Sequence, residues 1–247
     1  MDLITVRGQR LIREADVILY AGSLVNPALL EEAKKSCEIH NTAVMTLDEV
    51  LSVMERSEAE GKRIVRLHTG DPSIYGAIRE QMDALERRNI PYEVCPGVSS
   101  FCGAAASLKA EYTLPEVSQT VIITRAEGRT AVPERERLSA LASHGATMVL
   151  FLSAGLLRQV KEELLAGGYE PGTPCAIVYK ATWSEEQIVR GVLRELPEMA
   201  ERAGIQKTAW ILVGDFLGDD YALSRLYAPD FATEYRDAVP VGPERKL

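Results

Sequence analysis

A glycine, an acid and a proline stand together where an apolar run ends, at Gly70, Asp71 and Pro72 in the segment RLHTGDPSIYG. Glycine at a strand end lets a ligand approach the backbone, and a carboxylate accepts hydrogen bonds from a hydroxyl or an amine. Proline fixes the turn and suits the first position of a helix. The segment predicts a ligand-binding turn flanked by Ile74 or, alternatively, a plain strand-to-helix turn capped by Asp71.

A second turn of this kind occurs in CPGVSSFCGAAA at 95–106, after another β-rich run. Ser99 and Ser100 could bond a ligand or cap the helix that follows. The small side chains of that helix allow close packing on a sheet, so a tightly packed core helix is the alternative. Since ligands of open α/β sheets bind at the carboxyl ends of strands, two such turns favour one shared cleft.

Basic residues follow two later β-rich runs. Arg125 and Arg129 flank Glu127 in TRAEGRT, and Lys180 lies in VYKATW. Arginine binds carboxylates through two parallel hydrogen bonds, so these loops predict a site for an acidic ligand. The alternative for TRAEGRT is a solvated surface loop in which Glu127 pairs with an arginine.

Several kinds of chemistry lack their motifs. The chain contains neither GxxxxGK[ST] nor GxGxxG, and no nucleophile elbow, which disfavours a nucleotide-phosphate site and covalent hydrolysis. His40, His68 and His144 are too dispersed for a metal motif. We therefore expect no protein-bound metal.

Composition narrows the partners and the compartment. The net charge of −8, without a block of like charges, argues against a nucleic-acid partner. No apolar run approaches the roughly 18–20 residues that span a bilayer, and the N-terminal residues show no basic-then-apolar signal pattern, so no membrane partner is expected. The 4 cysteines form no CxxC pair and fit a reducing compartment. We expect a cytoplasmic protein.

The elements that must position these residues alternate between strands and helices, which predicts the α/β class. One helix begins at Thr46, with Glu49 completing a capping box. A proline and polar residues at 112–118 favour two α/β subdomains, 1–113 and 114–232, followed by a tail at 233–247 to which we assign no function. The predicted strands are 16–20, 63–68, 92–95, 120–124, 147–152, 174–179 and 209–213.

From residue 2 to about 225 the chain resembles the tetrapyrrole (corrin/porphyrin) methylase family. The segments that carry the resemblance are VILYAGSLV, HTGDPSIYG, PGVSSFCGAAA, TRAEGRT, MVLFLSAG, VYKATW and TAWILVGDFL. It implies two α/β subdomains with S-adenosylmethionine in the cleft between them, and a homodimer. The implied reaction transfers a methyl group to carbon 11 of precorrin-4 or cobalt-precorrin-4, a corrinoid tetrapyrrole of cobalamin biosynthesis.

The resemblance also implies site residues. Asp71 would contact the ribose or the amino group of the donor. Charge and loop position make Arg125, Arg129 and Lys180 candidates for binding the carboxylates of the macrocycle, and Tyr20, Tyr75 or Tyr112 candidates for stacking on the ring. No catalytic base is assigned, because alignment and desolvation can supply most of the catalysis of methyl transfer. The full expected donor pocket is Thr69, Gly70, Asp71, Ile74, Ser99, Ser100, Leu152, Ala181, Thr208 and Ala209.

One departure from the family pattern affects these expectations. The family opens with a strand and a GxGPGDP turn before the segment that matches DLITVRG, whereas this chain begins at Met1-Asp2. We therefore expect that strand and turn to be absent from it. The missing turn motivates one alternative, a truncated form that binds its ligand with little turnover. A separate alternative is methylation of another corrin carbon or of ribosomal RNA ribose in the same fold.

Overall fold

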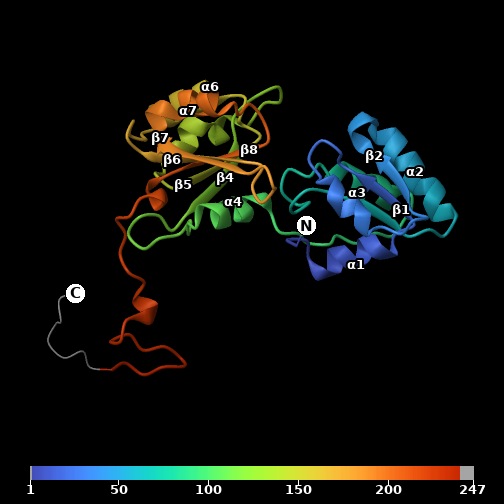
Figure 1. The fold of residues 1–247 in the computed structure, drawn as a ribbon, viewed down its shortest axis with the longest axis horizontal. Helices are drawn as coiled ribbons and strands as arrows, with labels where there is room; N and C mark the ends of the chain where they lie inside the picture. Colours follow the sequence, from blue (N-terminus) through green and yellow to red (C-terminus); the bar gives the residue numbers. More distant parts are fainter. Residues whose placement is uncertain (1, 240–247) are drawn as a thin grey trace. The chain divides into compact units, whose positions relative to one another are not determined.

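The computed structural model describes residues 2–239, so the last part of the predicted tail lies outside the described residues. The chain divides into two compact units, Met1–Gly103 and Ala104–Leu247. Both combine helices with a β-sheet, which confirms the α/β class (Figure 1). The division at 113/114 favoured by the sequence stays a prediction.

The first unit is built on three parallel strands in the order β2-β1-β3. Their bounds are β1 Val17–Tyr20, β2 Glu38–Asn41 and β3 Ile64–Leu67. Helices α2 (Leu47–Ala59) and α3 (Arg79–Arg87) pack on one face around Leu19, and α1 (Val6–Glu14) packs on the other through Ile12 and Ile18. Because parallel strands need crossover connections, helices cover both faces.

The start of α2 confirms the predicted capping box. The hydroxyl of Thr46 accepts a hydrogen bond from the N–H of Glu49, and the Glu49 carboxylate accepts one from the N–H of Thr46 at 2.7 Å. Two of the N–H groups that a helix start leaves unpaired are thereby satisfied. The apolar stripe of α2 faces the sheet, as its spacing predicts: Val50, Leu51, Val53 and Met54 are buried.

The second unit is built on five strands in the order β4-β5-β8-β6-β7. Strands β4 and β5 are parallel, and β8 runs antiparallel to both β5 and β6. A single large core joins the sheet to α5, α6 and α7. The bounds are α4 Ser100–Leu108, β4 Val121–Arg125, α5 Leu138–Ala142, β5 Thr147–Phe151, α6 Leu157–Ala166, β6 Pro174–Tyr179, β7 Gln187–Val192, α7 Leu196–Ala203 and β8 Ala209–Val213.

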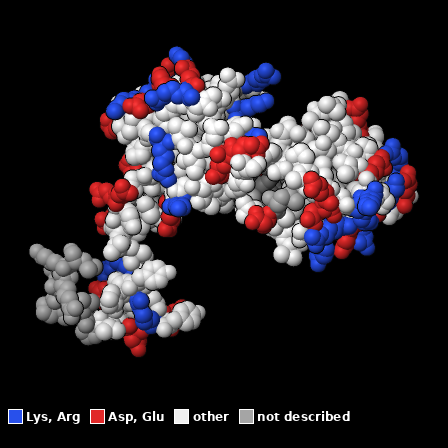
Figure 2. Space-filling view, in the orientation of Figure 1, with Lys and Arg blue, Asp and Glu red and all other residues white. Residues whose placement is uncertain are grey.

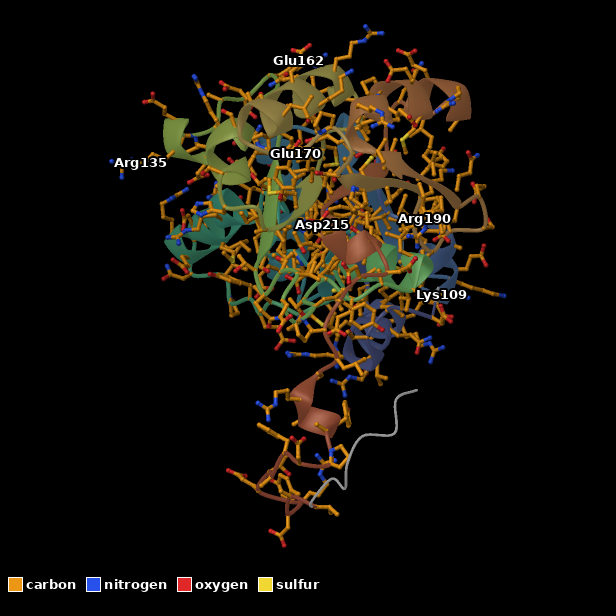
Figure 3. The ribbon with its side chains drawn as sticks, turned by 90° about the vertical axis from the view of Figure 1, so that its left-hand side faces the viewer. Lys109, Arg135, Glu162, Glu170, Arg190 and Asp215 are labelled. Atoms are coloured by element: carbon orange, nitrogen blue, oxygen red, sulfur yellow. The ribbon has the colours of Figure 1, made fainter. Side chains whose placement is uncertain are left out.

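The end of α4 is tied to the edge strand β7. The guanidinium of Arg190 donates a hydrogen bond of 2.6 Å to the carbonyl oxygen of Leu108, and Figure 3 labels Arg190 close to Lys109. Short 3-10 turns complete the chain at Pro27–Glu32, Thr42–Val44, Glu134–Glu136, Leu193–Glu195, Asp215–Leu217 and Arg225–Tyr227.

Residues 221–239 form an extended segment that folds back on itself. The Arg236 guanidinium donates hydrogen bonds to the carbonyl oxygens of Leu226, Ala228 and Phe231. Large apolar side chains of the segment point to solvent, with Leu223 81% and Tyr235 95% exposed. The described part of the predicted tail thus belongs to a local turn structure.

Six of the seven predicted strands are confirmed, and one is wrong: residues 92–95 belong to neither sheet. An apolar run becomes a strand only when a neighbouring strand completes its hydrogen bonds, and the β3 edge of the first sheet is not paired with this segment. Strands β2 and β7 were not predicted. Both lie at sheet edges, where mixed polar and apolar residues give no continuous apolar run.

The helix expected directly after Pro72 is also wrong, since α3 begins only at Arg79. Tyr75 and Ala77 adopt left-handed backbone, with φ of 55° and 50°. A Cβ on Gly76 would lie 2.1 Å from the Pro72 carbonyl oxygen, so the chain folds back tightly there. Left-handed residues interrupt a right-handed helix, which explains the delay.

Candidate functional site

The two glycine-containing turns of the first unit lie against each other. A Cβ on Gly97 would lie 2.0 Å from the Gly70 carbonyl oxygen, and a Cβ on Gly70 would lie 3.2 Å from the Ser100 backbone nitrogen. Gly70 also has a left-handed φ of 65°. Backbone therefore meets backbone here, and a side chain at Gly97 would force the turns apart. The structure brings Gly70 together with Ser99 and Ser100, as predicted from sequence.

Asp71 joins the same two turns. One carboxylate oxygen accepts hydrogen bonds from the Ser73 hydroxyl and from the Ser73 N–H at 2.9 Å, and the other accepts from the Gly97 N–H at 2.9 Å. The Ser73 hydroxyl, followed by the Gly97 N–H, lowers the pKa of Asp71 below its ordinary value. The side chain is therefore ionised at neutral pH, and it stabilises a turn without capping a helix.

Tyr20 ends β1 at the same edge of the first sheet. The Ala21 N–H donates to the Leu67 carbonyl oxygen at 3.1 Å, which places Tyr20 beside the strand that leads into the Gly70 turn. Its side chain packs partly buried against the small core around Ile18. Of the other predicted residues on this unit, Thr69 is exposed and Ile74 is half-buried.

Just before the turn lie two partly buried side chains, Arg66 on β3 and His68 directly after the strand. The Arg66 guanidinium donates to the carbonyl oxygens of Leu19 and Leu67, each at 3.2 Å. The His68 Nε2 atom is buried and has no hydrogen-bond partner. Burial, with the positive charge of Arg66 as a second cause, lowers the pKa of His68 to about 4. His68 is therefore neutral at neutral pH.

In the second unit, four predicted donor-site residues gather at one edge of the sheet. Tyr179 pairs with Ala209, the Lys180 N–H donates to the Thr208 carbonyl oxygen at 2.9 Å, and Leu152 follows β5 directly. The carboxyl ends of β4, β5 and β6 and the start of β8 thus meet. Leu152 and Ala181 differ in exposure, since Leu152 is 65% exposed and Ala181 only 9%.

Left-handed backbone is concentrated at this edge. Leu152, Lys180, Thr182 and Thr208 have φ of 51°, 45°, 70° and 57°, although none is a glycine. Each such residue costs about 1–3 kcal/mol and persists only where the surrounding structure imposes it. Strain of this kind accumulates at ligand sites, which supports a functional role for this edge.

The predicted basic residues are placed at the same sheet edge, with different surroundings. Arg125 closes its own loop by donating to the carbonyl oxygens of Ala126, Thr130 and Ala131. Arg129 is exposed. Lys180 pairs with Glu185 at 2.8 Å and lies 5.0 Å from the centre of the Trp183 ring. Hydrogen bonding between the pair raises the pKa of Lys180 and lowers that of Glu185 to about 2.

Two residues that order these loops were missed. Ser153, fully buried, accepts from the Ala126 N–H at 2.8 Å and donates to the Phe151 carbonyl oxygen at 2.6 Å, which joins the loops after β4 and β5. Glu186 accepts from the Thr182 N–H and from the Ser107 hydroxyl, each at 2.5 Å. A polar residue two positions after the end of a buried apolar strand was the available signal for Ser153.

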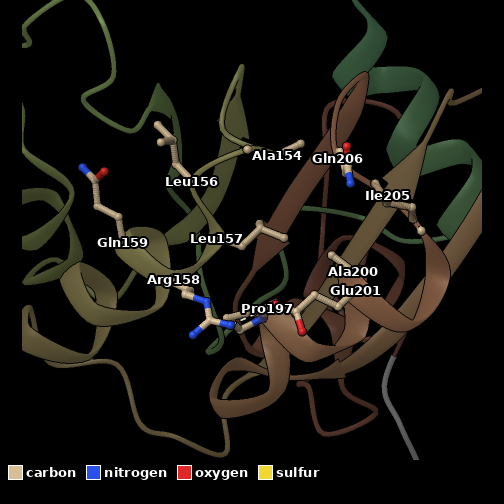
Figure 4. A pocket seen from close by; sticks show the side chains of 12 residues that line it. Ala154, Leu156, Leu157, Arg158, Gln159, Pro197, Ala200, Glu201, Ile205 and Gln206 are labelled. Atoms are coloured by element: carbon tan, nitrogen blue, oxygen red, sulfur yellow. Dashed lines mark hydrogen bonds and ion pairs between the residues drawn. The ribbon is translucent and has the colours of Figure 1, made fainter.

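A cavity of about 740 Å³ opens between the start of α6 and the end of α7 (Figure 4). Arg158 and Glu201 form an ion pair of 3.0 Å at its wall. None of the predicted site residues lines it, and both charged side chains are more than half exposed. We assign it no role in the chemistry.

Charges and metal-binding groups are dispersed. Basic and acidic side chains alternate on the face drawn in Figure 2, without a stripe of one sign. Among residues 2–239, no group of three or more His, Cys, Asp and Glu side chains could hold a metal ion. Every helix in this part of the chain is too short or too polar to cross a membrane.

Comparison with known proteins gives concordant results. Residues 1–197 match the family model of tetrapyrrole (corrin/porphyrin) methylases. The chain is 55% identical to a cobalt-precorrin-4 C(11)-methyltransferase of Methanocaldococcus jannaschii, over 95% of this chain and 91% of that protein.

Two solved structures share the fold. A cobalt-precorrin-4 methyltransferase of cobalamin biosynthesis matches with a TM-score of 0.86 and 48% identity, over 88% of this chain and 91% of that one. A uroporphyrin-III C-methyltransferase from Thermus thermophilus, solved in complex with S-adenosylhomocysteine, matches with a TM-score of 0.72 and 25% identity, over 87% and 93%.

Proposed function

The chain belongs to the tetrapyrrole (corrin/porphyrin) methylase family, and we propose that it transfers a methyl group from S-adenosylmethionine to carbon 11 of precorrin-4 or cobalt-precorrin-4. The observation that carries this proposal is 55% identity over 95% of the chain to a relative of that name. The reaction belongs to cobalamin biosynthesis, and the corrinoid ring is the small-molecule partner.

The residues of the chain fit S-adenosylmethionine as the methyl donor. Gly70 and Gly97 let the two turns touch, which gathers the backbone of both turns in one place for a polar ligand. The exposed Leu152 offers an apolar surface beside the strained strand ends. The donor site is proposed to be formed by Thr69, Gly70, Asp71, Ile74, Ser99, Ser100, Leu152, Ala181, Thr208 and Ala209.

The donor supplies an electrophilic methyl group on a positively charged sulfur. An electron pair of the ring carbon forms the new carbon–carbon bond, and the sulfur keeps the electron pair of the bond that breaks. The protein has to align the two carbon atoms with the sulfur and exclude water, which can contribute a large part of the rate. This role needs rigid loops more than a strong base, and Asp71, Ser153 and Glu186 supply that rigidity through the hydrogen bonds described above.

Four residues are proposed to form the macrocycle site. Arg129 offers an exposed guanidinium for a ring carboxylate, and Tyr20 offers a half-buried ring at the end of β1. Arg125 supports this role by closing the loop that carries Arg129, since its guanidinium bonds three carbonyl oxygens of that loop. Lys180 is held by Glu185 and Trp183, so it presents its charge in a fixed position.

We also propose that the protein is a cytoplasmic homodimer. The cysteines Cys37, Cys95, Cys102 and Cys175 are free, which fits a reducing compartment. Large apolar side chains exposed along 221–239 are surface that a second copy could cover. No nucleic-acid partner is proposed, because the chain carries a net charge of −8.

The test is methyl transfer from S-adenosylmethionine carrying a carbon-13 methyl group. The full chain is incubated separately with precorrin-4, cobalt-precorrin-4 and ribosomal RNA, and the products are analysed by mass spectrometry and carbon-13 NMR. We expect one labelled methyl group at carbon 11 of a corrinoid product. Label in ribosomal RNA, at another ring carbon, or in no product while S-adenosylhomocysteine still binds would contradict the proposal and support one of the alternatives.

A further inference from the structure

The carboxylate of Asp71 lies between the two glycine turns of the first unit, with both of its oxygen atoms engaged by the protein itself. We infer that Asp71 is a positioning residue, which fixes the 70–73 turn to the 96–100 turn and thereby sets the shape of the donor site without holding the donor directly. This inference rests on the proposed function, because it assumes that these turns contact S-adenosylmethionine. It replaces the direct contact with ribose or amino group that the resemblance implies.

The first support is that the two carboxylate oxygens of Asp71 accept hydrogen bonds from different turns. Oδ1 accepts both the hydroxyl and the backbone N–H of Ser73, which closes the turn around Pro72. Oδ2 accepts the N–H of Gly97, which belongs to the other turn, at 2.9 Å. Three of the roughly four acceptor sites of the carboxylate are thus taken in the protein alone, which leaves one on Oδ2 for a ligand hydroxyl or amine.

The second support is the backbone contact that this bond accompanies. Gly97 has no room for a Cβ, since the Gly70 carbonyl oxygen would be 2.0 Å away and the Asp71 Cα 3.6 Å away. Neither Gly70 nor Gly97 has a side chain, so side-chain packing adds little attraction between the two turns at this point. A charged acceptor that reaches from one turn to an N–H of the other supplies the attraction, because hydrogen bonds to ionised groups are shorter and stronger than neutral ones.

The local backbone explains why a carboxylate is needed. The left-handed Gly70 turns the chain so that the next side chain points toward Gly97, and the left-handed Tyr75 and Ala77 prevent a helix that could otherwise hold the loop. With no helix until Arg79, the 71–76 loop depends on side-chain hydrogen bonds for its order. Asparagine cannot replace the carboxylate fully, because it has only one acceptor oxygen. If that oxygen accepts from Ser73, the amide nitrogen faces the Gly97 N–H, and two donors then face each other.

The decisive experiment uses the ligand-free protein. Amide hydrogen exchange is measured by NMR for the full chain and for Asp71→Asn. We expect the Gly97 N–H to exchange about ten- to a hundredfold faster in the variant, the loss of one hydrogen bond to a charged group. Amides of α2 should exchange at an unchanged rate, which shows that the unit still folds. An unchanged rate at Gly97 would overturn the inference, since a carboxylate that serves only the ligand leaves the free protein unaffected.

Two matched variants separate the roles of the carboxylate. Ser73→Ala removes the hydroxyl bond to Oδ1 and keeps the bond to Gly97, so exchange at Gly97 should remain near the native rate. Asp48→Asn neutralises an exposed aspartate in the first turn of α2 and should leave both turns as they are. A comparable acceleration at Gly97 in Asp48→Asn would contradict a local effect of Asp71.

Ligand binding gives the second readout. Isothermal titration of Asp71→Asn with S-adenosylhomocysteine and with methylthioadenosine, which lacks the amino acid part, should show the same fold loss for both, about tenfold or more. A loss confined to S-adenosylhomocysteine would overturn the inference in favour of direct contact with the amino group. If neither compound bound the unmodified chain, the proposed function would fail, while the exchange experiment would still decide the positioning role.

Discussion

The two units stabilise the loops at the carboxyl ends of their strands by different physical means. In the first, the predicted donor residues depend on two glycines whose backbones touch and on one carboxylate between them. In the second, non-glycine residues adopt left-handed backbone above a sheet whose inner strands are almost fully buried. A large core can hold strained residues in place, whereas the thinner first sheet relies on close approach and local hydrogen bonds.

The largest expected effect concerns the core that supports the second unit. Leu150 is fully buried in the large core cluster, so Leu150→Ala should lower the free energy of unfolding by about 2–5 kcal/mol. Trp183 and Trp210 both lie in this unit, so tryptophan fluorescence during urea denaturation reports on it alone. The exposed Leu223→Ala should change stability by less than about 0.5 kcal/mol. An equal shift of the fluorescence transition by Leu19→Ala, in the first unit, would erase the distinction between the units.

The second largest effect concerns the glycine contact of the first unit. Gly97→Ala places a Cβ 2.0 Å from the Gly70 carbonyl oxygen, so the turns must separate. Misplacement of binding groups by about 1 Å can cost about a hundredfold, and we expect a loss of that order in S-adenosylhomocysteine affinity by isothermal titration. Gly172→Ala is the control, because a Cβ at that position would have nothing within 4 Å of it. Native affinity in Gly97→Ala would show that the contact does not shape the site.

A smaller effect is expected from pH, and only in the first unit. His68 has a pKa lowered to about 4 in the folded chain, so the unfolded chain binds the extra proton first as pH falls. Stability of this unit should decrease between about pH 6.5 and 4, by roughly 1–3 kcal/mol. In urea denaturation, far-ultraviolet circular dichroism reports the unfolding of both units, and tryptophan fluorescence of the same samples reports the unfolding of the second. His68→Asn should flatten the pH dependence, and His144→Asn, at an exposed site, should not.

The smallest effect has the opposite sign and tests strain in the second unit. Thr208 holds a φ of 57°, which glycine adopts without steric cost, so Thr208→Gly should raise the free energy of unfolding by about 0.5–1 kcal/mol. The fluorescence assay measures this change. Thr130→Gly, at an exposed position outside the left-handed region, should lower stability or leave it unchanged. Destabilisation by Thr208→Gly would mean that the side chain contributes more than its backbone strain costs.

The sequence predicts the strand ends well, because buried apolar runs such as 147–151 and 209–213 have one stable placement in an α/β sheet. Prediction from sequence fails where a segment depends on an adjacent strand for its hydrogen bonds. Residues 92–95 have strand-like composition but no adjacent strand, and β2, with Ile39 exposed, gains its hydrogen bonds from β1 rather than from burial. Local composition does not reveal which edges will be paired.

Prediction of the candidate site from the sequence has the same limit. Gly70, Ser99 and Ser100 come together as strand-end logic predicts. The partners of Asp71 do not follow from its spacing, since its bond to Gly97 crosses between two turns. Ser153 acts through hydrogen bonds to the backbone of another loop, and such a role depends on tertiary placement rather than on a motif. The types of the site residues were therefore more predictable than their roles.

The contact between Gly70 and Gly97 limits how this protein can be altered. When two side chains fill one space, enlarging one can be compensated by shrinking the other. Here the space at each glycine is occupied by the backbone of the opposite turn, which no substitution can make smaller. Efforts to change donor specificity by directed evolution should therefore leave this pair intact and vary Ile74 or the exposed Leu152, where side chains can exchange volume with a ligand.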